Sequence, residues 1–370
     1  MSGRSLAQAA RRAGYTPLVV DCFGDQDTRE VCAGVEVLPE ALRQGFLAKP
    51  LGQALDKLCG SSEAADQTAE PIELVLGSGF EDRPKLVEAL AKKYKLAGCG
   101  HTAIERCKDP HYFFSLLKEE GILHPETSDE RPAEPVGWLS KRIGACGGRH
   151  IRRLKGKGAA RRHRYYQREI SGEALSATAV ASSGGTAFAF TQSWCHPYKG
   201  QPFRFGGSVS MDTLDAELEA RVIDTCLSLI EPLELVGLVS FDFVVDNAGD
   251  AFLIEANPRP GASLEVLDDD EGTLFKAHMA ACRGDDALGV LANSWKPKPT
   301  AAAYLYADQG PLKVTSFPWP GWVRDRPAPG TKIGAGDPVA TVVAQADNAQ
   351  EAAEICRDRV ARLGAVLYES

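Results

Sequence analysis

Residues 239–257, VSFDFVVDNAGDAFLIEAN, predict a β-hairpin whose two faces differ in chemistry. Side chains in a strand point alternately to opposite sides of the sheet. One face is therefore wholly apolar and contains Phe241, Phe243, Val245, Phe252, Ile254 and Ala256. The other face contains Ser240, Asp242, Asp246, Glu255 and Asn257, together with Val244, Ala251 and Leu253. The pattern indicates a hairpin that packs one face on a core and gathers acids on the other.

The register of this hairpin follows from its turn, because Asn, Gly and Asp are typical turn residues and occupy 247–250. This loop predicts three cross-strand pairs: Asp246 with Ala251, Asp242 with Glu255, and Ser240 with Asn257. Like charges directly across a ladder are destabilising, so we expect a cation between Asp242 and Glu255. Carboxylate and amide oxygens suit Mg²⁺ better than zinc. The alternative is a half-exposed hairpin whose acids are merely solvated.

The chain leaves the hairpin abruptly at Asn257-Pro258-Arg259-Pro260-Gly261, since proline cannot continue a ladder. This places the guanidinium of Arg259 beside the acids. A guanidinium is a good bidentate partner for phosphate or carboxylate, so Arg259 is a candidate for contact with an anionic ligand.

The length of 370 residues predicts two or three domains. A net charge of −8 argues against a general binder of nucleic acid or of anionic membranes. The ten cysteines include no CxxC pair, which favours reduced thiols in a cytoplasmic protein. No apolar run reaches the length of a membrane span, and no signal peptide is recognisable.

The order of the expected elements predicts a multidomain α/β and α+β fold. Residues 1–98 alternate between helices and apolar strands, which predicts a doubly wound parallel sheet. The first helix opens at residue 2, so the strand expected before it either lies upstream or is missing. Residues 99–290 form the second domain, with a small mobile sheet subdomain, the flap, at about 133–195. Residues 291–370 are expected to form a small β-rich domain that ends in a helix.

Two further segments of the chain are predicted from their composition. Residues 211–230 are expected to be a helix, because their apolar residues recur at helical spacing. Residues 285–300, which end in KPKPT, are expected to be a linker.

Lys141 ends the predicted strand GWLSK and precedes Gly144, Gly147 and Gly148. Glycines let backbone N–H groups close around phosphate oxygens, and a lysine supplies a point charge. The segment lacks GxxxxGK[ST], so it is not a P-loop. The alternative is a glycine-rich turn beside an exposed lysine.

A strongly basic segment, RHIRRLKGKGAARRHR, follows at 149–164. In an acidic protein it predicts a local attraction for anions such as polyphosphate or an acidic substrate. A solvated flexible loop is the alternative for most of these side chains. An RNA-associated protein would use the same segment, but no aromatic residues are interleaved to stack bases.

Along the chain, the doubly wound domain is followed by the lysine-and-glycine flap, a helix and the acidic hairpin that ends at Arg259. In this order of elements, the chain resembles the ATP-grasp superfamily of carboxylate–amine ligases over residues 2–290. The resemblance implies an ATP-grasp fold in which Asp242, Glu255 and Asn257 bind two Mg²⁺ ions, with Mn²⁺ as a substitute. It also implies that Lys141 and the loop Gly144–Gly148 lie over the phosphates of ATP.

The same resemblance assigns further residues to the nucleotide site. Lys108 is the second lysine expected there, and the strand beside adenine contains Gln167, Arg168, Glu169 and Ile170. Two departures from the family pattern stand out. The acid of Gly172-Glu173-Ala174 is shifted by one position, and Ser240 stands where D-alanine ligases have an arginine. Arg259 or Arg204 would then steady the reaction intermediate, although Arg204 in PFRFGG also reads as a packed loop arginine.

No general base is evident among the seven histidines, which form no triad or ligand pattern. His150 and His196 either lie near the site or are structural or solvated, and the second reading is favoured because the sequence supplies no partner for them.

The resemblance implies an ATP- and Mg²⁺-dependent ligase that joins a carboxylate to an amine through an acyl phosphate. The segments SGRSLAQAARRAGY, EANPRPGAS and WPGWVRDRPAPGT are similar to a branch linked to methanopterin- or methanofuran-type cofactor synthesis. That branch suggests tyramine–glutamate ligase activity, with glutamate and tyramine or a pterin or furan precursor as substrates. A homodimer is a separate expectation, because dimers are common among soluble proteins. The alternative is a non-catalytic regulatory or scaffold protein that binds nucleotide with the same fold.

Overall fold

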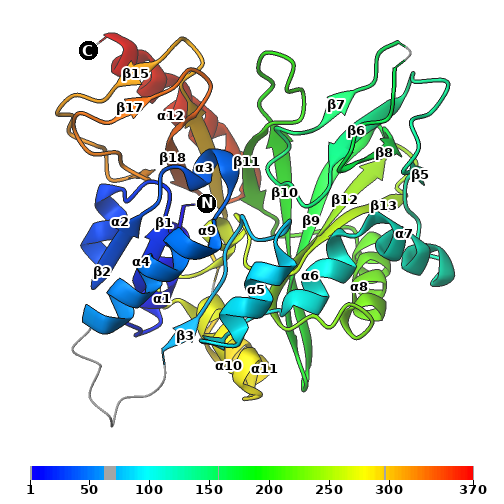
Figure 1. Ribbon diagram of the computed structural model, residues 1–370, viewed down its shortest axis with the longest axis horizontal. Coiled ribbons are helices and arrows are strands. Elements are labelled where there is room, and N and C mark those ends of the chain that lie inside the picture. Colours follow the sequence, from blue (N-terminus) through cyan, green and yellow to red (C-terminus); the bar gives the residue numbers. More distant parts are fainter. Residues whose placement is uncertain (1, 62–71, 157, 296, 370) are drawn as a thin grey trace.

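The computed structural model describes residues 2–61, 72–156, 158–295 and 297–369. Figure 1 shows the N-terminal helices and strands in blue beside the C-terminal part in orange and red. The long green strands of the largest sheet lie on the other side of the molecule.

The N-terminal part alternates between helices and short parallel strands, as predicted. Its elements are α1 Arg4–Arg12, β1 Leu18–Asp21, α2 Gln26–Val31, β2 Gly34–Val37, α3 Ala41–Gln44, α4 Ala48–Ser61, β3 Glu73–Leu74, α5 Pro84–Ala91 and β4 Lys95–Leu96. β1 pairs with β2 and β3 with β4, both in parallel, so the strands form two pairs in place of one continuous sheet. Phe46 stacks on Phe80 at 5.0 Å in the core that joins them.

The largest sheet has eight strands in the order β13-β12-β9-β10-β11-β14-β18-β16, all paired antiparallel. Its strands are β9 Gly172–Ser182, β10 Gly185–Cys195, β11 Phe205–Ser210, β12 Gly237–Asp246, β13 Ala251–Asn257, β14 Thr300–Tyr306, β16 Val323–Arg324 and β18 Pro338–Gln345. The sheet therefore runs on past residue 290 through the pairing of β11 with β14. The division of the chain into domains at 98 and 290 stays a prediction.

A second, four-stranded sheet carries the lysine and glycine segment. Its order is β5-β8-β6-β7, formed by β5 Thr127–Ser128, β8 Arg164–Arg168, β6 Trp138–Arg142 and β7 Arg152–Arg153. The flap sheet was predicted to extend to residue 195, but β9 and β10 pair with β12 and β11 in the large sheet. Both strands are eleven residues long, and the many buried side chains of β9 pack in the main core.

The hairpin of β12 and β13 has the predicted pairing at the end that carries the acids. Ser240 lies opposite Asn257 and Asp242 lies opposite Glu255. A β-bulge after Asp242 then shifts the register, so Ala251 lies opposite Val245 and the predicted pair with Asp246 is wrong. The extra residue of a bulge changes which side chains share a face.

The bulge exchanges the predicted places of Leu253 and Ile254. Leu253 is fully buried in the core with Phe241 and Phe243, although alternation had placed it on the polar face. Ile254 lies beside Glu255 on the wall of a cavity instead of in the core. The apolar face was thus predicted correctly for Phe241, Phe243 and Val245 on β12, and wrongly for Leu253 and Ile254 on β13.

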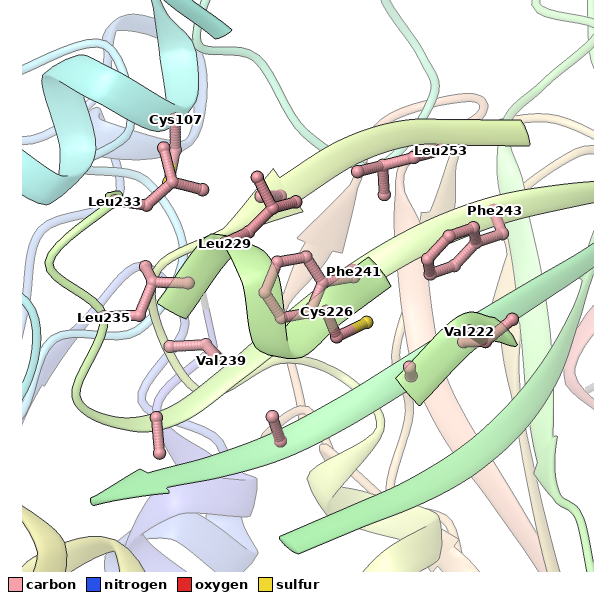
Figure 2. Close-up of a cluster of buried hydrophobic side chains, with 14 of the residues drawn as sticks. Cys107, Val222, Cys226, Leu229, Leu233, Leu235, Val239, Phe241, Phe243 and Leu253 are labelled. Carbon is pink, nitrogen blue, oxygen red and sulfur yellow. The ribbon is translucent and has the colours of Figure 1, made fainter. Parts of the chain in front are cut away.

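Helix α8, Ala216–Ile230, covers this apolar face. Asp215 caps the helix by accepting hydrogen bonds from the backbone N–H groups of Glu217 and Leu218, so it begins a little later than predicted. Its buried stripe of Val222, Cys226 and Leu229 follows helical spacing. Figure 2 shows these side chains packed with Phe241, Phe243 and Leu253. Burying a side chain of this size contributes about 1.5–3 kcal/mol, so α8 holds the hairpin in place.

The remaining elements complete the core and correct one prediction. They are α6 His101–Lys108, α7 Pro110–Glu119, α9 Leu264–Leu267, α10 Thr273–Arg283, α11 Ala287–Ser294, β15 Leu312–Lys313, β17 Lys332–Ile333 and α12 Ala349–Glu369. The expected linker at 285–300 contains α11, which Asp286 caps through the N–H of Gly289. Within the described part of the chain, no helix is long and apolar enough to span a membrane. All ten cysteines are free thiols.

Candidate active site

The polar ends of β12 and β13 bring the three predicted metal ligands together. The Asn257 amide donates from Nδ2 to Asp242 Oδ2 at 2.9 Å, and its Oδ1 faces the opposite way, toward Lys108. Ser176 is on β9, directly opposite Asp242 on β12, and its hydroxyl donates to Asp242 Oδ1 at 2.8 Å. Glu255 lies across the ladder from Asp242. The three side chains therefore form one connected group, in which Asn257 links Asp242 to Lys108.

Lys108 supplies a positive charge inside this group. Its ammonium donates to Glu255 and, at 2.8 Å, to Asn257 Oδ1. Its position follows from the local sequence, because Asp109 precedes Pro110 and a residue before proline disfavours helical backbone. Helix α6 thus ends at Lys108, and α7 starts afresh at Pro110. The sequence predicts a cation between Asp242 and Glu255, and in the structure the ammonium of Lys108 contacts one of them, Glu255.

The two acids of the hairpin have different electrostatic surroundings. Burial and the neighbouring Glu255 raise the pKa of Asp242 above its ordinary value, although Ser176 and Lys108 oppose the shift. Burial also disfavours ionisation of Glu255, but the ammonium groups of Lys108 and Lys141 hold its pKa below the ordinary range. Glu255 is thus readily ionised, and ionisation of Asp242 would be favoured by an additional positive charge nearby.

Lys141 lies in β6 and is almost fully buried. Its ammonium donates to Gln167 Oε1 at 2.6 Å, and Gln167 is on β8, the neighbouring strand. Burial lowers the pKa of Lys141 to about 8, against the opposing influence of Glu255 and Asp242. A partly desolvated ammonium interacts strongly with any anion that enters, because the surrounding dielectric is low.

The glycine-rich loop after β6 is held between two other segments. A side chain on Gly144 would meet the backbone of Glu81 and Asp82 at 2.8 Å, and one on Gly148 would lie 1.7 Å from the carbonyl oxygen of Phe203. Gly144, Gly147 and Gly148 all have positive φ, which only glycine adopts without strain. The loop therefore needs glycine for its backbone shape and, at two positions, for close approach.

Substitutions of Gly147 and Gly148 can distinguish the requirement for a positive φ from the requirement for close approach. Both have φ near +70°, but a side chain on Gly147 would meet nothing within 4 Å. We expect Gly147→Ala to cost about 1–2 kcal/mol of stability, the penalty for a left-handed backbone. We expect Gly148→Ala to cost clearly more, because the Phe203 backbone must also move. Urea unfolding of the two variants measures the difference, and equal losses would show that the contact with Phe203 is unimportant.

The charge of Arg259 favours ionisation of Asp242, and Arg259 is paired with an acid that the sequence analysis did not identify. Its Nε donates to Glu81 Oε1 at 2.7 Å, and both side chains are largely buried. Glu81 also accepts from the backbone N–H groups of Gly79 and Phe80. Burial opposes ionisation of Glu81, but Arg259 and Lys108 lower its pKa to about 2. The guanidinium is therefore held by a permanently charged partner.

Arg204 is committed elsewhere in the structure. It is fully buried, and its guanidinium donates to Asp308 and to the carbonyl oxygen of His196. The ring of Tyr306 lies 3.8 Å from the guanidinium carbon. These contacts match the packed loop arginine that was the alternative interpretation, and a role for Arg204 in the reaction stays an untested prediction.

The side chains of the strand predicted to lie beside adenine point in two directions. Gln167 points inward to Lys141. Arg168 instead lies over the Trp138 ring, and Glu169 pairs with Arg153 near the surface. Ile170 is half-buried. The structure thus brings Gln167 into the group and leaves Arg168 and Glu169 outside it.

One cavity is lined by both lysines, by the first glycine of the loop and by one of the two acids. Its wall includes Lys108, Lys141, Gly144, His150, Tyr165 and Glu255. Arg259 and Glu81 line a neighbouring, more apolar cavity with Phe80 and Ile104. Two lysines and a glycine loop on one wall favour an anionic ligand.

The oxygen donors fit the magnesium that the sequence predicts. Two carboxylates and a carboxamide are hard ligands of the kind that Mg²⁺ takes, with further positions left to water or phosphate. Across the described residues, no group of three or more His, Cys, Asp and Glu side chains is placed to hold a metal. The donor set is thus suited to a hard ion shared with a ligand, and it lacks the nitrogen and sulfur ligands of a zinc site.

Sequence reasoning missed Glu81, Ser176 and the position of His150. Glu81 lies in GSGFED, shortly after β3, and ligand sites in doubly wound sheets form beyond the carboxyl ends of strands. This rule was an available signal for Glu81. Ser176 required the pairing of β9 with β12, and no local pattern reveals that pairing.

Comparison with known proteins identifies the fold. The model of the ATP-grasp domain family matches residues 107–263, which include Lys108, Lys141, the hairpin and Arg259. N5-carboxyaminoimidazole synthetase from Staphylococcus aureus, complexed with ADP, has a TM-score of 0.66 at 14% identity, over 97% of this chain and 94% of that one. The chain has the ATP-grasp fold.

Further solved structures share this ATP-grasp architecture. Biotin carboxylase from Campylobacter jejuni, in complex with ATP, has a TM-score of 0.66 at 15% identity, over 94% of this chain and 86% of that one. The biotin carboxylase domain of 2-oxoglutarate carboxylase from Hydrogenobacter thermophilus, with MgADP and bicarbonate, has a TM-score of 0.66 at 13% identity, over 96% and 85%. No curated protein matches the sequence. At these identities the likeness concerns the fold.

Proposed function

We propose that this protein is an ATP- and Mg²⁺-dependent ligase that joins a carboxylate to an amine through an acyl phosphate. One observation carries the proposal. Asp242, Glu255 and Asn257 converge beside two buried lysines, with Lys108 in contact with the group and Lys141 on the wall of the same cavity. ADP or ATP in the solved structures of the same fold supports a nucleotide in this cavity.

The residues of this chain have distinct roles in that reaction. Phosphoryl transfer asks a protein for positioning and charge neutralisation more than for covalent chemistry. Lys141 and Lys108 would offset charge on the transferring phosphoryl group. Arg259, held by Glu81, would orient the substrate carboxylate. The loop Gly144–Gly148 would close over the phosphates and keep water from the acyl phosphate.

Mg²⁺ would be held by Asp242, Glu255 and Asn257, where it would neutralise charge on the terminal phosphates of ATP. With the ion present, the raised pKa of Asp242 would fall, because the added positive charge favours the carboxylate. Lys108 would then exchange some of its contacts with Glu255 and Asn257 for contacts with phosphate oxygens. Mn²⁺ is expected to substitute for Mg²⁺ because both accept oxygen ligands.

The finer predictions concern the substrates and the setting. We infer glutamate as the carboxylate and tyramine, or a pterin or furan precursor, as the amine, within cofactor synthesis of the methanopterin or methanofuran kind. This inference is supported by the likeness of EANPRPGAS and WPGWVRDRPAPGT to that branch. A cytoplasmic homodimer is the accompanying expectation.

A screen for ADP release tests the proposal. The protein is incubated with ATP and Mg²⁺ and with pairs of amino acids and small amines, including glutamate with tyramine and glutamate with pterin-linked acceptors. We expect ADP formation that requires both members of one pair, with a stoichiometric amide product seen by mass spectrometry. Nucleotide binding without ADP release for any pair would favour the regulatory or scaffold alternative.

A further inference from the structure

His150 has a buried ring nitrogen that has no hydrogen-bond partner among the residues that the structure describes. This atom, Nδ1, is shielded from solvent. An unpartnered buried polar atom costs about 1–3 kcal/mol, and such atoms are few in folded proteins. The side chain that carries this atom belongs to the wall of the cavity with Lys108 and Lys141, so a ligand bound there could supply the missing partner.

The position of His150 is fixed by the flap sheet. The Arg164 side chain on β8 donates to the carbonyl oxygen of His150 at 2.7 Å and to that of Ser140 on β6 at 2.9 Å. The N–H of Ile151 donates to the carbonyl oxygen of Gly148 at 3.1 Å. The backbone at His150 is thus anchored to β8 and within its own turn, and its side chain belongs to the cavity wall.

The surroundings of the ring indicate an anionic partner. His150 shares the cavity wall with Lys108, Lys141 and Gly144. Burial, with the nearby Lys141 and Arg164, lowers the pKa of His150 to about 4, so the ring is neutral at pH 7. A neutral imidazole adds a hydrogen-bond donor without adding to the repulsion between the cations. Mg²⁺ is an unsuitable partner, because it prefers oxygen ligands.

Resting on the nucleotide site proposed above, we propose that His150 donates a hydrogen bond from Nδ1–H to an oxygen of the terminal phosphates of the bound nucleotide. The ring would then select for the phosphate end of the ligand, alongside Lys141 and the backbone of the glycine loop. This assigns a ligand contact to a histidine that the sequence pattern favoured as structural or solvated.

Three substitutions of His150 test which ring nitrogen matters. The amide nitrogen of asparagine can occupy the place of Nδ1, and that of glutamine the place of Nε2. We expect His150→Asn to bind MgADP within about threefold of the unaltered protein. We expect His150→Ala and His150→Gln to bind about 10- to 100-fold more weakly, the range for a lost hydrogen bond to a charged group. Isothermal titration calorimetry with MgADP and with a non-hydrolysable MgATP analogue measures these affinities.

His163→Asn is the matched control, because His163 lies in the same flap but is exposed, and asparagine tolerates its positive φ. We expect its affinity to be unchanged. Equal binding by His150→Ala and the unaltered protein would overturn the proposal, as would equal losses in the asparagine and glutamine variants. If the unaltered protein binds no nucleotide, the proposed function fails as well, which is a different result from a failure confined to the variants.

A measurement on the unaltered protein covers the case in which the His150 variants fail to fold. With ¹⁵N-labelled histidine, we expect one Nδ1 resonance to move to the position of a protonated, hydrogen-bonded nitrogen when MgADP is added. No change in any histidine Nδ1 resonance at saturating MgADP would contradict the contact.

Discussion

Glu255→Gln should fold normally and lose nearly all ligase turnover. The glutamine side chain keeps an oxygen for the Lys108 ammonium, which also retains its 2.8 Å contact with Asn257. What is lost is a negative charge among the ligands of the expected Mg²⁺. Charge stabilisation by a catalytic metal is worth several kcal/mol, so we expect turnover to fall about 10³-fold, equivalent to about 4 kcal/mol. ADP release with the substrate pair found by the screen measures the loss.

The matched control for this substitution is Glu217→Gln on α8, because the Glu217 side chain is 83% exposed and pairs with Arg221 on its own helix. Its turnover should be unchanged. A titration with Mg²⁺ adds a second readout, because the Glu255→Gln variant should need a higher concentration of the ion for its residual activity. Turnover near that of the unaltered protein would remove Glu255 from the metal site.

Arg259→Met should cause the largest loss of stability among these substitutions. The side chains of Arg259 and Glu81 are 13% and 3% exposed, so the substitution leaves Glu81 buried without its counter-ion. Breaking a buried pair in this way costs about 3–5 kcal/mol. The backbone N–H groups of Gly79 and Phe80 still donate to Glu81 and will offset part of this cost. Urea unfolding measures the change.

The double variant Glu81→Gln, Arg259→Met identifies the cause of that loss. With both charges gone, no unpaired ion is buried, so we expect the double variant to be more stable than Arg259→Met alone. Lys92→Met, which breaks an exposed pair with Glu88 on the surface of α5, should change stability by less than about 1 kcal/mol. Additive losses at Glu81 and Arg259 would show that the pair is not coupled.

The pH dependence of the same variant gives an independent check. The folded-state pKa of Glu81 is about 2 and its ordinary value is 4.5. The pair therefore stabilises the unaltered protein fully above about pH 4.5, and this contribution is lost as the pH falls toward 2. In Arg259→Met the buried acid loses the largest of the interactions that favour its ionisation. The difference in stability between the two proteins should thus narrow over that range, and a constant difference would contradict the pairing.

The hairpin shows how far local rules reach. Alternation and a turn of known residue types predicted that Asp242 faces Glu255 and Ser240 faces Asn257, and both pairs are confirmed. The same rules placed Leu253 on the polar face, and the bulge after Asp242 reverses this. A bulge depends on how the twisted strand fits α8 and the rest of the core, so the two-residue period does not reveal it.

Arg259 and Arg204 show what local sequence rules cannot predict. Both were candidates from their residue type and neighbours, but their partners lie far away in the chain: Glu81 is 178 residues from Arg259, and Asp308 is 104 residues from Arg204. A guanidinium has the same chemistry in either place. Only the packing of separate elements determines which one faces a cavity and which one is enclosed by Asp308 and Tyr306.

By itself, the sequence determined the residue types of the candidate site, the pairing of its acids and the end of α6 at Lys108. These follow from strand alternation, turn chemistry and the restriction that Pro110 places on Asp109, and all three act over a few residues. Tertiary structure alone decided that Lys108 contacts Glu255, that Glu81 pairs with Arg259 and that the side chain of His150 lines the cavity. These contacts join segments that come together because apolar surface is buried over the whole chain. The hydrophobic effect is non-directional, so a local sequence pattern does not specify which distant segments will meet.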